Sequence, residues 1–159
     1  MVPRTIRVVA LAVLVAAGIA AAPAPARADG FGIGLFLIEP TGVTFKIDLQ
    51  RTSAIEILLG VTRLQENNTK YGHLTYLITP FAARGRSVNV PFRLGIGAAL
   101  YDDVAFAVRA PFEIAFQFRG PPLELYGELA VKVTFVDSCD QCDDVYADLD
   151  GGIGFRIYL

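Results

Sequence analysis

Two cysteines separated by two residues, Cys139-Asp-Gln-Cys142, are the stretch whose residue types and spacing could do chemistry. Thiol oxidoreductases and zinc sites both use this spacing. A zinc site needs two more soft ligands, yet the chain has no other cysteine and a single histidine. The pattern favours a structural disulfide between Cys139 and Cys142 over a redox or metal role, so we expect no metal and no cofactor. Nearby carboxylates could offer oxygen ligands to Ca²⁺, but they lack the spacing and glycine of an EF-hand loop: Asp137, Asp140, Asp143 and Asp144.

The one histidine, His73, is the other residue that could act in catalysis. A catalytic base needs a nucleophile within hydrogen-bond reach, and the serines (Ser53, Ser87 and Ser138) fall in predicted turns or loops. We expect a noncatalytic protein in which His73 is a hydrogen-bonded interior side chain.

The elements that must position these residues are strands. Apolar and polar residues alternate with a period of two between turn signals, and no stretch after residue 30 keeps a helical period. Eight such runs are present, at residues 31–38, 43–50, 55–62, 71–82, 88–98, 104–118, 123–135 and 145–159. Short connections that carry arginine alternate with longer, more polar or acidic ones. This pattern predicts an all-β fold, an eight-stranded antiparallel up-and-down barrel, with a bulge at Pro111 because proline cannot donate to a strand ladder.

One face of each predicted strand is almost continuously Ile, Val, Leu and Phe, and the other mixes small residues with charges of both signs. In a soluble lipocalin-like barrel the apolar face would point inward, whereas in a membrane barrel it faces lipid. Small residues on the mixed face suit the crowded interior of a narrow barrel, which favours the membrane arrangement. The lumen is then predicted to be plugged by paired charges: Lys46, Asp48, Glu56, Arg93, Arg109, Glu113, Glu124, Glu128, Lys132, Asp148, Asp150 and Arg156.

The first 28 residues have the pattern of a cleavable signal peptide. Arg4 and Arg7 precede an apolar run, and Ala26-Arg27-Ala28 is a small-x-small cleavage site. We therefore expect a single barrel domain at residues 29–159, on the oxidising side of a membrane. The chain carries 16 acidic and 14 basic residues, and three arginines leave with the signal, so a nucleic-acid partner is not expected.

The last residues form an apolar strand with no polar tail, in which Phe155, Ile157 and Leu159 alternate with Arg156 and Tyr158. A terminal strand of this kind needs a partner for its edge, and a closed barrel supplies one. The ending Phe155, Ile157, Tyr158, Leu159 resembles the C-terminal signature of outer-membrane proteins that the barrel-assembly machinery recognises.

The whole of residues 29–159 resembles the OmpA-like and OmpX-like eight-stranded barrels. The stretch GIGLFLIEPTG, residues 32–42, is similar to the first hairpin of a family of small, functionally uncharacterised outer-membrane barrels of Gram-negative bacteria. This resemblance implies a monomer in the Gram-negative outer membrane whose partners are outer-membrane lipid and, during biogenesis, the assembly machinery.

Three function classes follow from these patterns. The leading one is a noncatalytic outer-membrane barrel with a structural or surface-contact role in the envelope. The second is a secreted soluble lipocalin-like barrel that carries an apolar ligand, in which every face assignment reverses. The third is an outer-membrane lipid-modifying enzyme; one family of such barrels uses a His-x-Ser pair, and this chain has His73-Leu74-Thr75, without the serine.

Overall fold

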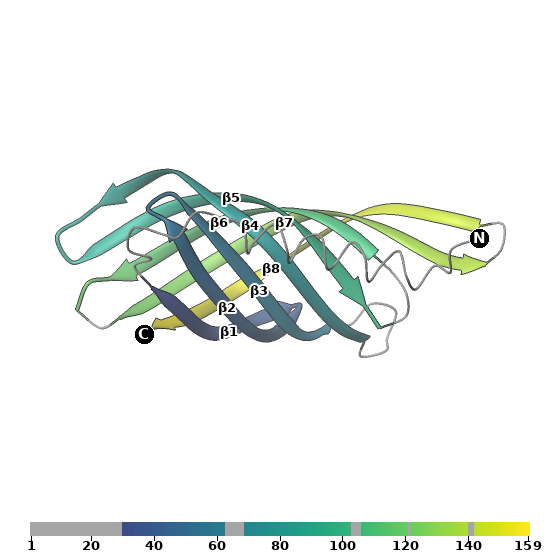
Figure 1. The fold of residues 1–159 in the computed structure, drawn as a ribbon, viewed down its shortest axis with the longest axis horizontal. Helices are drawn as coiled ribbons and strands as arrows, with labels where there is room; N and C mark the ends of the chain where they lie inside the picture. The colour runs from purple at the N-terminus through teal and green to yellow at the C-terminus, as the bar shows by residue number, and fades with distance from the viewer. Residues whose placement is uncertain (1–29, 63–68, 103–105, 121, 140–141) are drawn as a thin grey trace.

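The chain forms a closed barrel of eight antiparallel strands (Figure 1). The structure is a computed structural model that describes residues 30–62, 69–102, 106–120, 122–139 and 142–159. Each strand pairs with its neighbours in sequence, and the last pairs with the first. The strands are β1 (Phe31–Glu39), β2 (Thr41–Gln50), β3 (Ser53–Thr62), β4 (Thr69–Arg84), β5 (Val88–Tyr101), β6 (Phe106–Phe118), β7 (Leu123–Cys139) and β8 (Cys142–Tyr158).

The prediction of an all-β fold with eight strands is confirmed, and each predicted run corresponds to one strand. The predicted signal peptide, residues 1–28, lies outside the described residues. Among those that are described, no helix is long and apolar enough to cross a membrane.

Closure of the barrel depends on the pairing of β1 with β8. Leu35 lies opposite Phe155 and Ile33 opposite Ile157 in this ladder, and the amide of Leu159 donates to the carbonyl of Phe31 at 2.9 Å. The two backbones approach so closely at Gly34 that a β-carbon there would lie 1.7 Å from the carbonyl oxygen of Phe155. From Gly151 to Tyr158 the apolar part of β8 is therefore paired with β1, so this stretch has no free edge.

The two ends of the barrel differ. The connections at 51–52, 85–87 and 119–122 lie at one end, together with the start of β1 and the end of β8; we call this the turn end. The last residues of β1, β3, β5 and β7 and the first residues of β2, β4, β6 and β8 lie at the opposite end, which we call the loop end. The β7–β8 hairpin continues beyond the predicted strand bounds, to Cys139 and Cys142, and projects past the other strands (Figure 1).

The apolar face of every strand points outward. Large apolar side chains with exposed fractions of 40% to 58% occur on all eight strands, for example Leu35, Ile47, Leu59, Ile78, Leu94, Phe112, Leu129 and Ile153. Most charged residues in the middle of the same strands are buried inside the barrel, among them Arg93, Arg109, Glu113 and Arg156. The barrel is thus inverted relative to a water-soluble protein, in which the apolar face forms the core.

Stacked phenylalanine pairs lie on neighbouring strands near both ends of the barrel. Phe81 and Phe92 stack near the turn end with ring centroids 4.4 Å apart, and Phe106 stacks on Phe135 at 6.2 Å near the loop end. Phe81 and Phe135 are exposed on the outer wall. Exposed phenylalanine side chains therefore occur near both ends of the barrel.

The predicted bulge at Pro111 is wrong. Pro111 pairs in register with Ala130 on β7, and the register between β5 and β6 is the same on either side of the proline. The residue across from Pro111 on β5 is Gly95, and a β-carbon on Gly95 would lie 2.9 Å from the proline ring. The absence of a side chain at Gly95 makes room for the ring, so the strand needs no extra residue to accommodate it.

Candidate functional site

The most highly organised part of the molecule is a set of buried ion pairs in the barrel interior. At its centre lies Arg156 of β8, which is 0% exposed. Its guanidinium group contacts Glu56 Oε1 at 2.5 Å, Glu124 Oε1 at 2.7 Å and Glu113 Oε2 at 3.0 Å. Arg93 pairs with Glu113 and lies 2.6 Å from Glu124 Oε2. We call Glu56, Arg93, Glu113, Glu124 and Arg156 the central network.

The central network connects five strands across the lumen, β3, β5, β6, β7 and β8. Period-two alternation places these residues inward, and the strand register brings them to one level: Glu113 lies opposite Arg93 on one side and Glu128 on the other. Opposite charges that are buried together must pair closely, because an unpaired charge in this environment costs several kcal/mol, about 3–5 where one partner is removed.

The central network continues toward the turn end through a tyrosine and a lysine. Tyr158 donates from its hydroxyl to Glu124 Oε2 at 3.1 Å and accepts from Lys46 Nζ at 2.9 Å. Lys46 also pairs with Asp48 Oδ1 at 2.5 Å. Gln117 donates to Glu124 at 2.8 Å. This chain of contacts joins the buried ion pairs to the partly exposed Asp48 at the mouth of the barrel.

A second group of charges lies nearer the loop end, around Arg109. Arg109 is 0% exposed and contacts Glu128 Oε1 at 2.5 Å and Asp150 Oδ1 at 3.4 Å. Lys132 lies 3.5 Å from Asp150 Oδ2. The Arg109 guanidinium also donates to Thr75 at 3.1 Å. We call Arg109, Glu128, Lys132 and Asp150 the upper network.

His73 belongs to the surroundings of the upper network. Its Nε2 atom lies 3.2 Å from Arg109 Nη1, and its Nδ1 atom lies 3.2 Å from the hydroxyl of Tyr71. Arginine can only donate, so Nε2 accepts and Nδ1 carries the hydrogen that is given to Tyr71. Both ring nitrogens are engaged and the side chain is buried, as expected for a hydrogen-bonded interior histidine.

Of the twelve predicted lumen charges, the structure places ten in the buried interior: Lys46, Glu56, Arg93, Arg109, Glu113, Glu124, Glu128, Lys132, Asp150 and Arg156. Asp48 is partly exposed at the turn-end mouth and pairs with Lys46. Asp148 differs from the prediction. It is exposed and accepts from the amide of Leu149 at 2.7 Å, because β8 at this position has already entered the projecting part of the β7–β8 hairpin.

Aromatic side chains that the sequence reasoning did not single out fill the space between the ion pairs. Tyr126 lies under the guanidinium of Arg156, 3.6 Å from ring centroid to the central carbon, and stacks on Phe36 at 5.7 Å. Tyr71 packs edge-on against Tyr101 at 5.1 Å. These aromatic residues share the strand face of the inward-pointing charges, and this alternation was the sequence signal that could have placed them in the lumen. These rings close the lumen and contribute cation–π attraction to the buried charges.

Three carboxylates of the interior lie close together. Carboxylate oxygens of Glu56, Glu113 and Glu128 lie within 4.8 Å of one another, which is a separation that a metal ion could bridge. Arg156 and Arg109 already supply positive charge to these carboxylates. Arg109 and Arg156 are both 0% exposed, so neither guanidinium group contacts solvent.

Two predicted features remain: the cysteine pair at the loop end of the β7–β8 hairpin and the C-terminal signature at the end of β8. The backbones of Cys139 and Cys142 are opposite each other in the β7–β8 ladder, but their side chains lie outside what the structure describes, so the disulfide stays a prediction. Of the C-terminal signature, Ile157 and Leu159 are exposed on the outer wall, Phe155 is half-buried, and Tyr158 points into the mouth. The role of this C-terminal signature in barrel assembly also stays a prediction.

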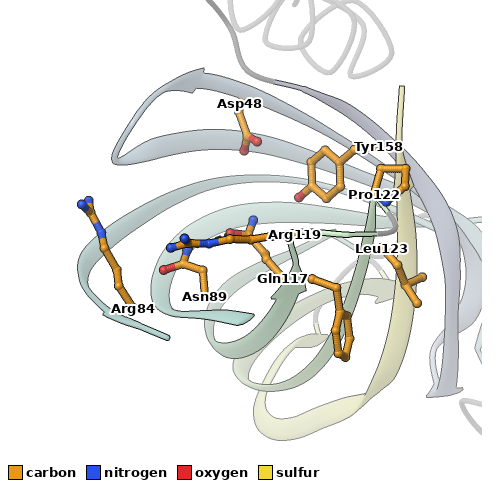
Figure 2. A pocket seen from close by; sticks show the side chains of 9 residues that line it. Asp48, Arg84, Asn89, Gln117, Arg119, Pro122, Leu123 and Tyr158 are labelled. Atoms are coloured by element: carbon orange, nitrogen blue, oxygen red, sulfur yellow. Dashed lines mark hydrogen bonds between the residues drawn. The ribbon is translucent and has the colours of Figure 1, made fainter. Parts of the chain in front are cut away.

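The turn-end mouth contains two adjoining pockets. The first, of about 450 Å³, is lined by side chains that include Asp48, Arg84, Arg119 and Tyr158 (Figure 2). The second, of about 440 Å³, shares Asp48 and Arg84 with the first and reaches down to Arg93 of the central network. The mouth is therefore lined largely by polar side chains, and its inner end is formed by Arg93 of the central network.

Comparison of the chain with protein-family models, with curated proteins and with solved structures gives no match.

Proposed function

We propose that the protein is a noncatalytic β-barrel of the Gram-negative outer membrane, with a structural or surface-contact role in the envelope. The observation that supports this most strongly is the inverted distribution of side chains. Arg109, Arg156, Glu113 and Glu124 are 0% exposed inside the barrel, while Leu59, Ile96 and Leu149 are 57%, 64% and 62% exposed outside it. A water-soluble monomer rarely exposes a large continuous apolar surface, whereas lipid requires one.

The length of the strands fits a bilayer. Strands β2 and β3 have 10 residues each. At a rise of about 3.4 Å per residue and a tilt of about 40°, such a strand covers about 26 Å along the membrane normal, close to the height of about 25 Å typical of the apolar band. Closure of the barrel also satisfies the backbone hydrogen bonds that an open sheet would leave unpaired in lipid.

The burial pattern does not favour the alternative of a soluble carrier for an apolar ligand. Such a carrier needs an apolar cavity, and the interior of this barrel holds the central and upper networks. The alternative of a lipid-modifying enzyme needs a nucleophile beside a base that lipid can reach. His73 is buried, and both of its ring nitrogens have partners inside the barrel. We therefore favour the noncatalytic role.

Refolding tests this proposal. The chain from residue 29 onward, unfolded in urea, is diluted either into detergent micelles or into buffer alone, and circular dichroism and gel migration before and after boiling are compared. We expect a β-rich species that forms only with detergent and migrates differently after boiling. A folded monomer in buffer alone would contradict the proposal and favour a water-soluble barrel.

A further inference from the structure

The turn-end mouth combines positive charge, an unpaired hydrogen-bond acceptor and an apolar rim, and together these define the chemistry of a ligand. Figure 2 shows the side chains around the first pocket. Its arginines are Arg84, at the end of β4, and Arg119, in the β6–β7 turn. Both are exposed and surround the mouth, which opens to solvent.

The described part of the chain does not neutralise the positive charge of the mouth. Within the described ranges, neither Arg84 nor Arg119 forms an ion pair with a carboxylate. The one acidic side chain of the pocket, Asp48, is paired with Lys46 at 2.5 Å. An anion that enters the mouth therefore meets two available guanidinium groups, which bind phosphate oxygens well because their donors form a planar fork.

The floor of the mouth offers an acceptor for which the described residues supply no donor. Asn89 donates from Nδ2 to Gln117 Oε1 at 3.0 Å, but its Oδ1 atom is buried and has no hydrogen-bond partner within the described part of the chain. A buried acceptor without a partner is costly, about 1–3 kcal/mol. A hydroxyl group on the ligand would satisfy Asn89 Oδ1 while an anionic group of the same ligand contacts the arginines.

The rim on the β6–β7 side is apolar. Phe118, Pro122 and Leu123 line the same pocket as Arg119. Phe118 and Leu123 are half-buried, and Leu123 begins the strand that carries Leu125 on the outer wall. The pocket is therefore continuous with the apolar exterior, so one ligand can place a polar group in the mouth and an acyl chain over the rim.

We infer that the turn-end mouth binds the headgroup of an anionic, hydroxyl-bearing phospholipid of the phosphatidylglycerol type. The phosphate contacts Arg84 and Arg119, a glycerol hydroxyl donates to Asn89 Oδ1, and an acyl chain crosses Phe118, Pro122 and Leu123. This inference rests on the proposed function, because it needs the turn end to lie at a lipid surface.

Titration of the folded barrel tests the inference. The protein is folded in zwitterionic micelles and titrated with short-chain phosphatidylglycerol, with short-chain phosphatidylcholine, or with glycerol 3-phosphate, and amide chemical shifts of Asn89, Gln117 and Leu123 are followed. We expect saturable shifts with phosphatidylglycerol, weaker ones with glycerol 3-phosphate, which lacks the acyl chain, and none with phosphatidylcholine. Equal affinity for phosphatidylglycerol and phosphatidylcholine would overturn the inference. Equal affinity for glycerol 3-phosphate would overturn the role of the lipid and leave a site for free phosphate groups.

Charge variants make the test specific to the mouth. Arg84→Gln or Arg119→Gln should weaken phosphatidylglycerol binding about fivefold each, which is the usual effect of one basic residue at an anionic lipid surface. The matched control is Lys70→Gln, which removes an exposed positive charge at the loop end and should leave the affinity unchanged. Unchanged affinity in Arg84→Gln/Arg119→Gln, with the barrel still folded, would contradict the site.

The outcome also separates this inference from the proposed function. If the chain does not fold in micelles, the membrane barrel fails and the lipid site fails with it. If the chain folds in micelles and does not distinguish phosphatidylglycerol from phosphatidylcholine, only the lipid site fails.

Discussion

Replacement of Arg156 by methionine is the most informative perturbation of the interior. Methionine is unbranched and apolar, so it fills part of the same space but removes the guanidinium that contacts Glu56, Glu113 and Glu124 at 2.5, 3.0 and 2.7 Å. Glu113 and Glu124 keep Arg93 as a partner, but among the described residues Glu56 keeps only the hydroxyl of Thr44, which donates at 2.8 Å. A buried carboxylate without a counter-charge costs about 3–5 kcal/mol.

We therefore expect Arg156→Met to lower the free energy of unfolding by about 3–5 kcal/mol, measured by urea titration of the barrel in micelles with circular dichroism as the signal. Adding Glu56→Gln should restore about 1–2 kcal/mol, because the orphaned charge is removed and residues in contact do not behave additively. Lys70→Met, at an exposed ion pair with Asp102, is the control and should not change stability measurably.

Two results would contradict this role of Arg156 in the central network. Stability of Arg156→Met equal to that of the wild type would mean that the central network does not hold the lumen together. A double variant less stable than Arg156→Met alone would mean that Glu56 has another partner in the folded barrel.

Three further predictions concern the wall, the seam and the cysteines. Leu94 is 45% exposed at an outward position of β5, so Leu94→Arg should lower the free energy of urea unfolding of a bilayer-inserted barrel by about 2–4 kcal/mol. Thr52→Arg, in a turn, is the control and should not lower it. Equal effects of the two substitutions would place Leu94 outside the membrane. Gly34→Val should abolish the heat-sensitive gel shift, because a β-carbon at Gly34 would lie 1.7 Å from a backbone oxygen of β8. The control is Gly120→Val, where an added β-carbon would have no neighbour within 4 Å among the described residues. A normal gel shift in Gly34→Val would contradict the β1–β8 register. Thiol alkylation of the secreted protein under non-reducing conditions should label neither cysteine, and labelling of both would exclude the predicted disulfide.

The sequence predicted the fold well because the alternation of side chains is a local property. Ile33, Leu35 and Leu37 on one face and Gly32 and Gly34 on the other can be read from β1 alone, and the structure confirms both faces. The parity of each strand also placed Arg93, Glu113 and Arg156 inward without knowledge of their partners.

The details that were wrong depend on relations between strands. Whether Pro111 needs a bulge is decided by Gly95 on the neighbouring strand, and only the register shows that the two residues are opposite. Asp148 has the parity of a lumen residue, but it lies where the β7–β8 hairpin has left the barrel, and this depends on where the other strands end. The aromatic filling by Tyr71, Tyr101 and Tyr126 likewise follows from three-dimensional packing.

Depth-dependent quenching of a single tryptophan tests whether the apolar outer wall of the barrel contacts lipid. The chain contains no tryptophan, so a Leu94→Trp variant reports only on the outer wall and a Thr52→Trp variant only on the turn end. Each variant is folded into vesicles whose acyl chains are brominated near the bilayer centre. We predict strong quenching of Leu94→Trp and weak quenching of Thr52→Trp. Fluorescence of folded Leu94→Trp that the brominated lipid does not reduce would contradict an apolar wall in contact with lipid.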